Sequence, residues 1–132
     1  MLFMPLKMIS TENAPKAVGP YSQAVQAGNI LFCSGQLPID PKSGELKLFG
    51  GNAAEQAKLV MNNLKEVLAA EGLTFNDVAK TTIFLSDMNN FGAVNEVYAS
   101  YFGEYKPARA CIAVKSLPKN VDVEIEAIAY YG

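Results

Sequence analysis

The stretch VDVEIEAIAYY, residues 121–131, alternates apolar side chains with others at a period of two. Successive residues of a β-strand point to opposite faces of the sheet, so this pattern predicts a strand with one buried face. The face expected to be buried carries Val123, Ile125, Ala127 and Ala129. The opposite face carries Asp122, Glu124, Glu126, Ile128 and Tyr130. A strand of this kind needs a covering layer on its apolar side.

Two segments have the spacing of an amphipathic helix and can supply that layer. The apolar stripe of the first consists of Ala57, Val60, Met61, Leu64, Val67 and Leu68. The stripe of the second consists of Phe91, Val94, Tyr98, Tyr101 and Phe102. Asn52, with Glu55 three residues later, predicts the start of the first helix, and Gly72 its end. For the second helix, Asn89 or Asn90 is the expected cap and Gly103 the expected end.

Three more segments have strand character: NILFCSG (29–35), VAKTTIFLS (78–86) and RACIAVKS (109–116). With two further strands expected before residue 29, the order of elements is β, β, β, α, β, α, β, β. Two helices cover one face of such a sheet, so we predict an α+β fold in a single domain over residues 1–132, with both helices on the same face. On the strand 109–116, we expect Ala110, Ile112 and Val114 to face the helices. The uncovered face is then expected to carry Arg109, Cys111, Ala113 and Lys115.

Composition excludes several kinds of chemistry. The chain has no histidine, which removes Ser-His-Asp and Cys-His nucleophiles and argues against a catalytic zinc site, so we expect no metal. The net charge is −2 and there is no Lys/Arg run, which argues against a nucleic-acid partner.

The two cysteines and the first residues bear on the compartment. Cys33 and Cys111 sit in apolar runs, where reduced, buried thiols are the expected state in a cytosolic protein. The start, MLFMPLKMIS, is broken by Pro5 and Lys7 and is too short for a membrane span or a signal peptide. We therefore expect a cytoplasmic protein without a membrane partner, and we assign no function to residues 1–6.

Arg109 is the residue that most needs an explanation. Its guanidinium is permanently charged and matches a carboxylate through two parallel hydrogen bonds. It is therefore either one half of an ion pair with Glu124 or Glu126, or a receptor for a substrate carboxylate. The same two glutamates are candidates for activating a water, and their spacing does not choose between them. The arginine could lower the pKa of the Cys111 thiol, although a buried small side chain is the simpler interpretation.

Five stretches of the chain resemble, in order, the RidA (YjgF) family. They are ENAPKAVGPYSQAV, SGQLPIDPKSGEL, DVAKTTIFLSDMNNFGAVNEVYASYF, KPARACIAV and LPKNVDVEIEAIAY. The resemblance implies a chorismate-mutase-like α+β fold that assembles as a homotrimer with ligand sites between subunits. It also implies a hydrolase without metal or organic cofactor, a 2-iminobutanoate/2-iminopropanoate deaminase that converts enamines and imines such as 2-aminoacrylate to 2-keto acids and ammonia.

The family's site residues transfer by motif. The carboxylate-binding arginine matches Arg109, and the water-positioning glutamate matches Glu124, the first glutamate of VEIEA. The remaining substrate-binding positions match Tyr21, Ser34, Gly35, Phe91, Asn95 and Cys111. The stretch FGEYKPAR is shorter than in some relatives, which leaves the preferred substrate side chain open.

Two other interpretations remain at this stage. In one, the protein binds small carboxylates such as 2-keto acids without catalysis, and Glu124 is only a hydrogen-bond partner. In the other, Arg109 and Glu124 form a structural ion pair across the subunit interface.

Overall fold

A computed structural model describes residues 5–132 of the chain. The strands are β1 (Lys7–Ile9), β2 (Ala24–Ala27), β3 (Ile30–Gln36), β4 (Val78–Leu85), β5 (Ala108–Ala113) and β6 (Val123–Tyr130). The helices are α1 (Ala53–Ala69) and α2 (Phe91–Ala99), with 3-10 turns η1 (Phe49–Gly51), η2 (Phe75–Asp77), η3 (Met88–Asn90) and η4 (Pro118–Asn120). This is the predicted α+β order. Within the described residues, neither helix has the length and apolarity that a membrane crossing requires.

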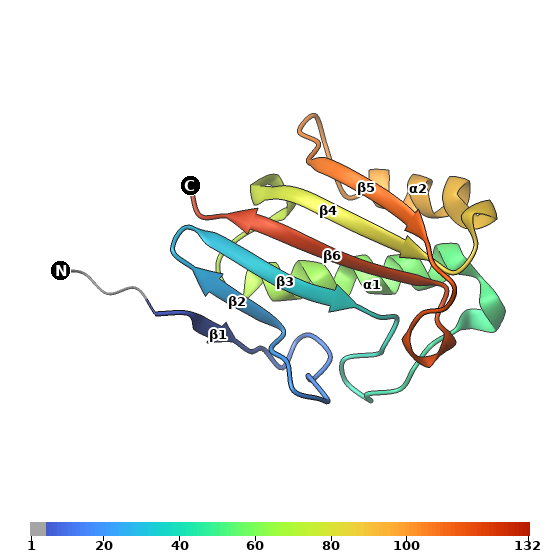
Figure 1. Ribbon diagram of the computed structural model, residues 1–132, viewed down its shortest axis with the longest axis horizontal. Helices are drawn as coiled ribbons and strands as arrows, with labels where there is room; N and C mark the ends of the chain where they lie inside the picture. The colour runs from blue at the N-terminus through green and yellow to red at the C-terminus, as the bar shows by residue number, and fades with distance from the viewer. Residues whose placement is uncertain (1–4) are drawn as a thin grey trace.

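The strands form one mixed sheet in the order β1-β2-β3-β6-β4-β5. The β4–β5 pair is parallel, because α2 lies between these strands in the chain and carries it back across the sheet. The other neighbouring strands are antiparallel. As a result β6 is central and β5 is an edge strand (Figure 1).

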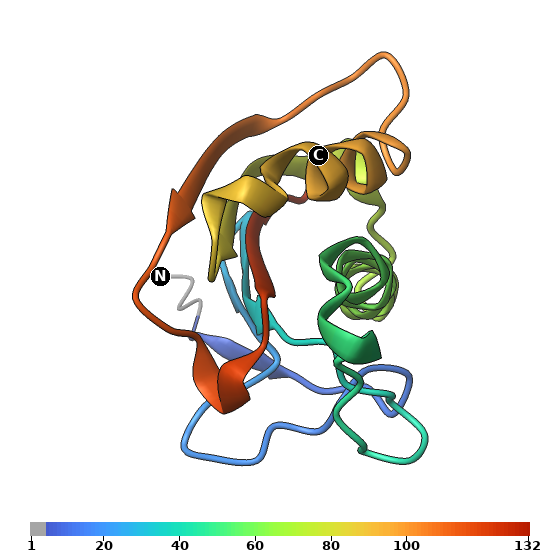
Figure 2. The same cartoon turned by 90° about the vertical axis from the view of Figure 1, so that its right-hand side faces the viewer.

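Both helices lie behind the sheet in the view of Figure 1, so the viewer faces the side that they leave open. Figure 2 shows α1 nearly end-on beside the sheet. The core lies between these layers: Val60, Leu64 and Val67 of α1 are fully buried, as are Val123 and Ile125 of β6. The buried face predicted for the last strand is therefore confirmed.

The caps of α1 agree with the prediction, whereas those of α2 do not. The Asn52 side chain accepts a hydrogen bond from the Glu55 N–H at 3.1 Å, and Gly72 adopts φ 70°. Asn90 makes no capping hydrogen bond with its side chain, because η3 runs directly into α2. Asp87 caps that turn by accepting from Asn89 N–H, and α2 ends at Ala99 rather than near Gly103.

The predicted faces of β5 are wrong. In the parallel ladder Arg109 is paired with Thr81 and Cys111 with Ile83, and paired residues share a face. Thr81 and Ile83 are buried under the helices, so Arg109 and Cys111 point to the helix side. Ile112, which the alternation had assigned to the helices, is 46 % exposed on the open face. The pattern misled because β5 is an edge strand with small residues on both faces.

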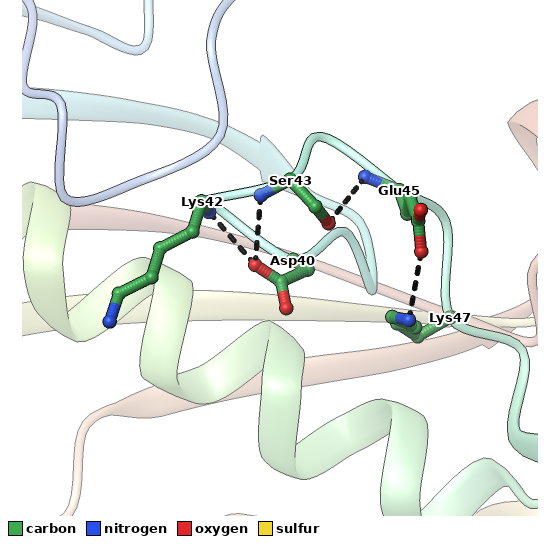
Figure 3. A network of polar contacts seen from close by, with 5 residues as sticks. All are labelled: Asp40, Lys42, Ser43, Glu45 and Lys47. Carbon is green, nitrogen blue, oxygen red and sulfur yellow. Dashed lines mark hydrogen bonds and ion pairs between the residues drawn. The ribbon is translucent and has the colours of Figure 1, made fainter.

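The loop between β3 and α1 is a compact, hydrogen-bonded unit (Figure 3). One carboxylate oxygen of Asp40 accepts from the N–H groups of Lys42 and Ser43, and these bonds lower the pKa of Asp40. Lys47 and Glu45 form an exposed ion pair at 3.0 Å. A bridge between Ile39 and Leu46 closes the loop. These bonds therefore hold Ile39 in a defined position beside the sheet.

Candidate functional site

The Arg109 guanidinium is held against α2. Its Nη1 donates a hydrogen bond to Asn95 Oδ1 at 2.6 Å. Its central carbon lies 5.4 Å from the ring centre of Phe91 and 5.1 Å from that of Tyr98, within the range of cation–π attraction. Phe91, Asn95 and Tyr98 follow the i, i+4, i+7 spacing of one helix face. The helix therefore orients the cation and leaves most of its donors for a ligand.

Tyr98 is itself held in place by a hydrogen bond to the sheet. Its hydroxyl shares a 2.7 Å hydrogen bond with the buried Thr81 hydroxyl on β4. Burial raises the pKa of Tyr98, which therefore remains a neutral phenol beside the arginine. Arg109 opens onto a pocket of about 440 Å³ lined by Asn95, Tyr98, Ala99, Phe102, Lys106, Pro107 and Arg109. Two cations and no carboxylate line this pocket, which suits an anionic ligand.

Glu124 belongs to a second pocket, of about 490 Å³, on the open face of the sheet. Its lining consists of Val18, Tyr21, Ser34, Gly35, Leu37, Ile39, Pro118, Lys119, Glu124 and Glu126. Three other predicted site residues, Tyr21, Ser34 and Gly35, thus lie together with Glu124. The Ser34 hydroxyl donates to Ser22 O at 2.6 Å and retains its capacity to accept a hydrogen bond.

A β-bulge in β3 makes room for the Glu124 carboxylate. Cys33 is paired with Ala127 and Gln36 with Ile125, so three steps on β3 correspond to two on β6. The extra residue falls at Ser34-Gly35. A Cβ added to Gly35 would collide with Glu124 Oε2 and lie 2.9 Å from its Cδ. A side chain at position 35 would therefore displace the Glu124 carboxylate, which lies directly over the Gly35 backbone.

The environment of Glu124 favours its protonated form more than water does. Partial burial is the main cause, and the neighbouring charge of Glu126 adds to it, so the pKa of Glu124 is raised. A carboxyl group whose pKa is raised toward neutral pH both accepts and returns a proton more readily during a reaction. Glu126, the other candidate glutamate, is exposed.

The two halves of the predicted site lie on opposite faces of the sheet. Arg109, Asn95, Phe91 and Cys111 are on the helix side, whereas Glu124 and its neighbours are on the open side. Among residues 5–132, the ion pairs are Lys7–Glu71, Lys47–Glu45 and Lys58–Glu55. A pair between Arg109 and Glu124 or Glu126 within one chain, which the predicted faces would have allowed, is therefore wrong.

Cys111 behaves differently from the expectation of an activated thiol. Arg109 does lower the pKa of this thiol, but burial raises it more, and the net shift is upward. Both cysteines are free, and burial raises the pKa of Cys33 to about 12. Cys111 is therefore a neutral thiol at pH 7, able to donate a weak hydrogen bond but not to act as a nucleophile.

Tyr98 and Lys119 are two of the pocket residues that sequence reasoning missed. Tyr98 was assigned only to the apolar stripe of its helix, yet its position three residues after Asn95 and seven after Phe91 indicates the arginine platform. Lys119 had no signal in its neighbourhood, because it reaches the Glu124 pocket through the turn η4 and a left-handed backbone with φ 57°.

Comparison with known proteins identifies the family and the fold. Residues 11–131 match the family model described as endoribonuclease L-PSP. A 2-iminobutanoate/2-iminopropanoate deaminase of Mus musculus is 52 % identical, covering 96 % of this chain and 92 % of the mouse protein. A RutC family protein of Pyrococcus horikoshii is 56 % identical, covering 94 % and 97 % of the respective chains.

Solved structures show the same fold. The Escherichia coli YjgF structure matches with a TM-score of 0.89 at 45 % identity, covering 96 % of this chain and 99 % of that one. Escherichia coli TdcF, solved with bound serine, matches with a TM-score of 0.89 at 43 % identity, again covering 96 % and 99 %. The chain belongs to the RidA/YjgF family, the family described as endoribonuclease L-PSP.

Proposed function

We propose that this protein hydrolyses 2-imino acids to 2-keto acids and ammonia, the activity for which its mouse and Escherichia coli relatives are named. One observation carries the proposal: a guanidinium oriented by Asn95 is available for a carboxylate, and a carboxyl group with a raised pKa lies in a separate pocket. These are the two groups that the reaction requires. One binds the substrate's carboxylate, and the other handles the proton of the attacking water.

The proposed site is formed by two subunits. A substrate of three or four carbons cannot reach Arg109 and Glu124 of one chain, because the sheet lies between them. The open face exposes large apolar side chains that a second copy would cover. They are Met8 (77 % exposed), Phe32 (48 %), Ile112 (46 %) and Tyr130 (50 %).

The assembly we propose is a homotrimer. The helix side of β5 in one subunit would meet the Glu124 pocket of the next, so two different surfaces would be in contact. A head-to-tail contact of this kind closes into a ring when the rotation between subunits allows it, and a trimer, the assembly that the family resemblance implies, is the smallest such ring. Each trimer would then contain equivalent sites at its interfaces.

In the proposed reaction, Arg109 binds the carboxylate of the imino acid and fixes the adjacent C=N carbon beside a water. An enamine substrate first tautomerises to the imine. Glu124 accepts a proton from the water as the new C–O bond forms, and the imine nitrogen takes up a proton from solvent. In the resulting carbinolamine, Glu124 returns its proton to the nitrogen, the C–N bond breaks to release ammonia, and the hydroxyl gives its proton to solvent as it becomes the keto oxygen. The overall change is imine plus water to keto acid plus ammonia.

The required acceleration is modest, because such imines already hydrolyse in water. A positioned general base contributes about 10²–10⁴-fold, and holding the water near the carbon adds to this. A protein without histidine or an activated thiol can therefore carry out this reaction with one arginine and one glutamate.

The direct test generates 2-aminoacrylate in the assay with a serine dehydratase and follows keto-acid formation. The wild-type protein should accelerate hydrolysis, and Arg109→Ala and Glu124→Gln should each lose most of that acceleration while remaining folded. If a folded Arg109→Ala variant hydrolyses the imine as fast as the wild type, the arginine assignment is wrong. If Glu126→Gln rather than Glu124→Gln is inactive, the general base is the other glutamate.

A second candidate is a binding protein for small amino or keto acids. The observation that favours it is the relative TdcF, which was solved with bound serine. Calorimetric titration with 2-ketobutyrate separates the two. Binding that depends on Arg109, without any imine hydrolysis, supports the binding protein.

A further inference from the structure

Gln56 is a fully buried polar residue of α1 whose side-chain amide is hydrogen-bonded to Leu48 and Asp122. Its Nε2 donates to Asp122 Oδ2 and to Leu48 O, each at 2.9 Å. Its Oε1 accepts from the Asp122 N–H at 2.8 Å. One amide thus holds both the backbone and the side chain of Asp122, which is 66 residues away in sequence.

Asp122 is held from the other side by the end of β4. Its Oδ1 accepts from the Ser86 hydroxyl at 2.6 Å, and its carbonyl accepts from the Ser86 N–H at 3.1 Å. Together Gln56 and Ser86 fix the residue that precedes β6 between the helix layer and the sheet. We refer to Gln56, Ser86 and Asp122 as the β6 clasp.

The start of β6 needs such support. Pairing with β3 begins only at Ile125, so Val123 and Glu124 are paired on the β4 side alone. The turn η4 just before the strand holds Lys119 and Asn120 in left-handed conformations, both with φ 57°. A left-handed conformation is unfavourable for most residues with a side chain, so this turn depends on a fixed downstream end.

We propose that Gln56 is a positioning residue for Glu124, because the β6 clasp fixes the start of β6 and thereby holds the Glu124 carboxyl group over Gly35. The inference rests on the proposed function, in which this carboxyl group meets the attacking water. Gln56 itself is a buried residue of α1, and it acts on Glu124 only through Asp122.

Loss of the β6 clasp should change the pKa of Glu124 as well as the position of its carboxyl group. The charged or titratable groups that line its pocket are Glu126 on β6, Lys119 in η4 and Tyr21 in the adjoining loop. Partial burial is the main reason for its raised pKa. A loosened β6 start admits water to the carboxylate, which lowers that pKa.

The experiment compares three variants in the full-length protein. Gln56→Met removes the clasp while keeping side-chain length, and Ser86→Ala is the milder variant should Gln56→Met fail to fold. Asp122→Asn is the conservative variant, because its amide still offers an oxygen to Gln56 and an N–H to the Ser86 hydroxyl.

Tyr131→Phe is the matched control. It removes the 2.8 Å hydrogen bond from Tyr131 to Glu71, which joins the far ends of the same helix and strand. This variant loses one partly buried hydrogen bond, as Ser86→Ala does, but away from Glu124. Its kcat and pH profile should therefore match the wild type.

In Gln56→Met, kcat should fall about 10- to 100-fold, as expected for a misplaced reacting group, while KM stays within about twofold because Arg109 is untouched. The acidic limb of the pH profile should move to lower pH. Ser86→Ala should show the same changes to a smaller extent, and Asp122→Asn should retain wild-type behaviour. If kcat of Gln56→Met is lower at every pH but the acidic limb of its pH profile stays at the wild-type position, the inference is overturned.

An inactive wild type would refute the proposed function but not this inference. The pKa of Glu124 can then be measured directly from the carboxyl ¹³C shift of labelled glutamate, with Glu124→Gln assigning the signal. A lower pKa in Gln56→Met than in the wild type and Tyr131→Phe supports the positioning role, and equal values contradict it.

Discussion

Arg109 and Glu124 face opposite sides of one sheet, on strands separated by β4. Arg109 rests on the aromatic face of α2, and Glu124 lies over the β3 bulge on the side without helices. A small substrate that needs both groups must therefore bind between two copies of the chain. The fold itself thus argues that assembly and activity are linked.

The guanidinium of Arg109 should matter by its shape and not only by its charge. In Arg109→Lys the charge remains, but the planar fork and its bond to Asn95 are lost. We expect KM to rise about tenfold or more, equivalent to at least about 1.4 kcal/mol, with a smaller change in kcat. Steady-state kinetics on the in situ imine measures this. Wild-type kinetics in the lysine variant would show that charge alone suffices.

Gly35 should not tolerate a methyl group. In Gly35→Ala the added Cβ collides with the Glu124 carboxylate, so the carboxylate must move away from the bulge. We expect kcat to fall at least about tenfold, with little change in KM. Gly103→Ala is the control, since a Cβ there meets nothing within 4 Å. Equal kcat values for the two variants would contradict the close approach of Glu124.

The acidic limb of the pH–activity profile should depend on the repulsion between the Glu124 and Glu126 carboxylates. Glu124 acts as a base, so its raised pKa places the limb above the usual range for glutamate. Glu126→Gln removes the like charge and should shift the limb to lower pH. The shift should be partial, because burial is the larger cause.

The same pair should affect stability. The folded state holds the Glu124 proton more tightly than the unfolded state, so stability falls as pH rises through the raised pKa. Urea unfolding of the wild type and Glu126→Gln at pH 5 and pH 8 checks the sign. Glu126→Gln should lose less stability between these values, and a larger loss would contradict this account.

Loss of the Tyr98 hydroxyl should lower stability without weakening substrate binding. Tyr98→Phe keeps the ring under Arg109 but leaves the buried Thr81 hydroxyl without its 2.7 Å partner. We expect a loss of about 1–3 kcal/mol in the free energy of unfolding, measured with urea, and a KM close to that of the wild type. A large rise in KM would show that the phenol hydroxyl contributes to binding beyond supporting the ring.

The fold was largely predictable because its signals are local. The period-two pattern of residues 123–129 and the stripe of α1 each bury one face, and the structure confirms both. The faces of β5 were not predictable in the same way. Arg109 and Cys111 alternate with Ala110 and Ile112 on an edge strand, and only the register with β4 decides which pair meets the helices.

The grouping of the candidate site residues was predictable only in part. Tyr21, Ser34, Gly35 and Glu124 do share a pocket, and Asn95 does contact Arg109. Their division between two faces depends on which strands are neighbours, and this follows from contacts between distant segments. The contact between Gln56 and Asp122 is of the same kind, and no local pattern indicates it.

The most direct test of the account is complementation between two inactive variants. Arg109→Ala and Glu124→Gln, each purified, are mixed in equal amounts, unfolded together and refolded, and imine hydrolysis is then measured. If each site takes Arg109 from one subunit and Glu124 from the next, random assembly restores about a quarter of the wild-type sites. We predict activity near that fraction. A mixture that stays as inactive as its two components would contradict a site shared between subunits.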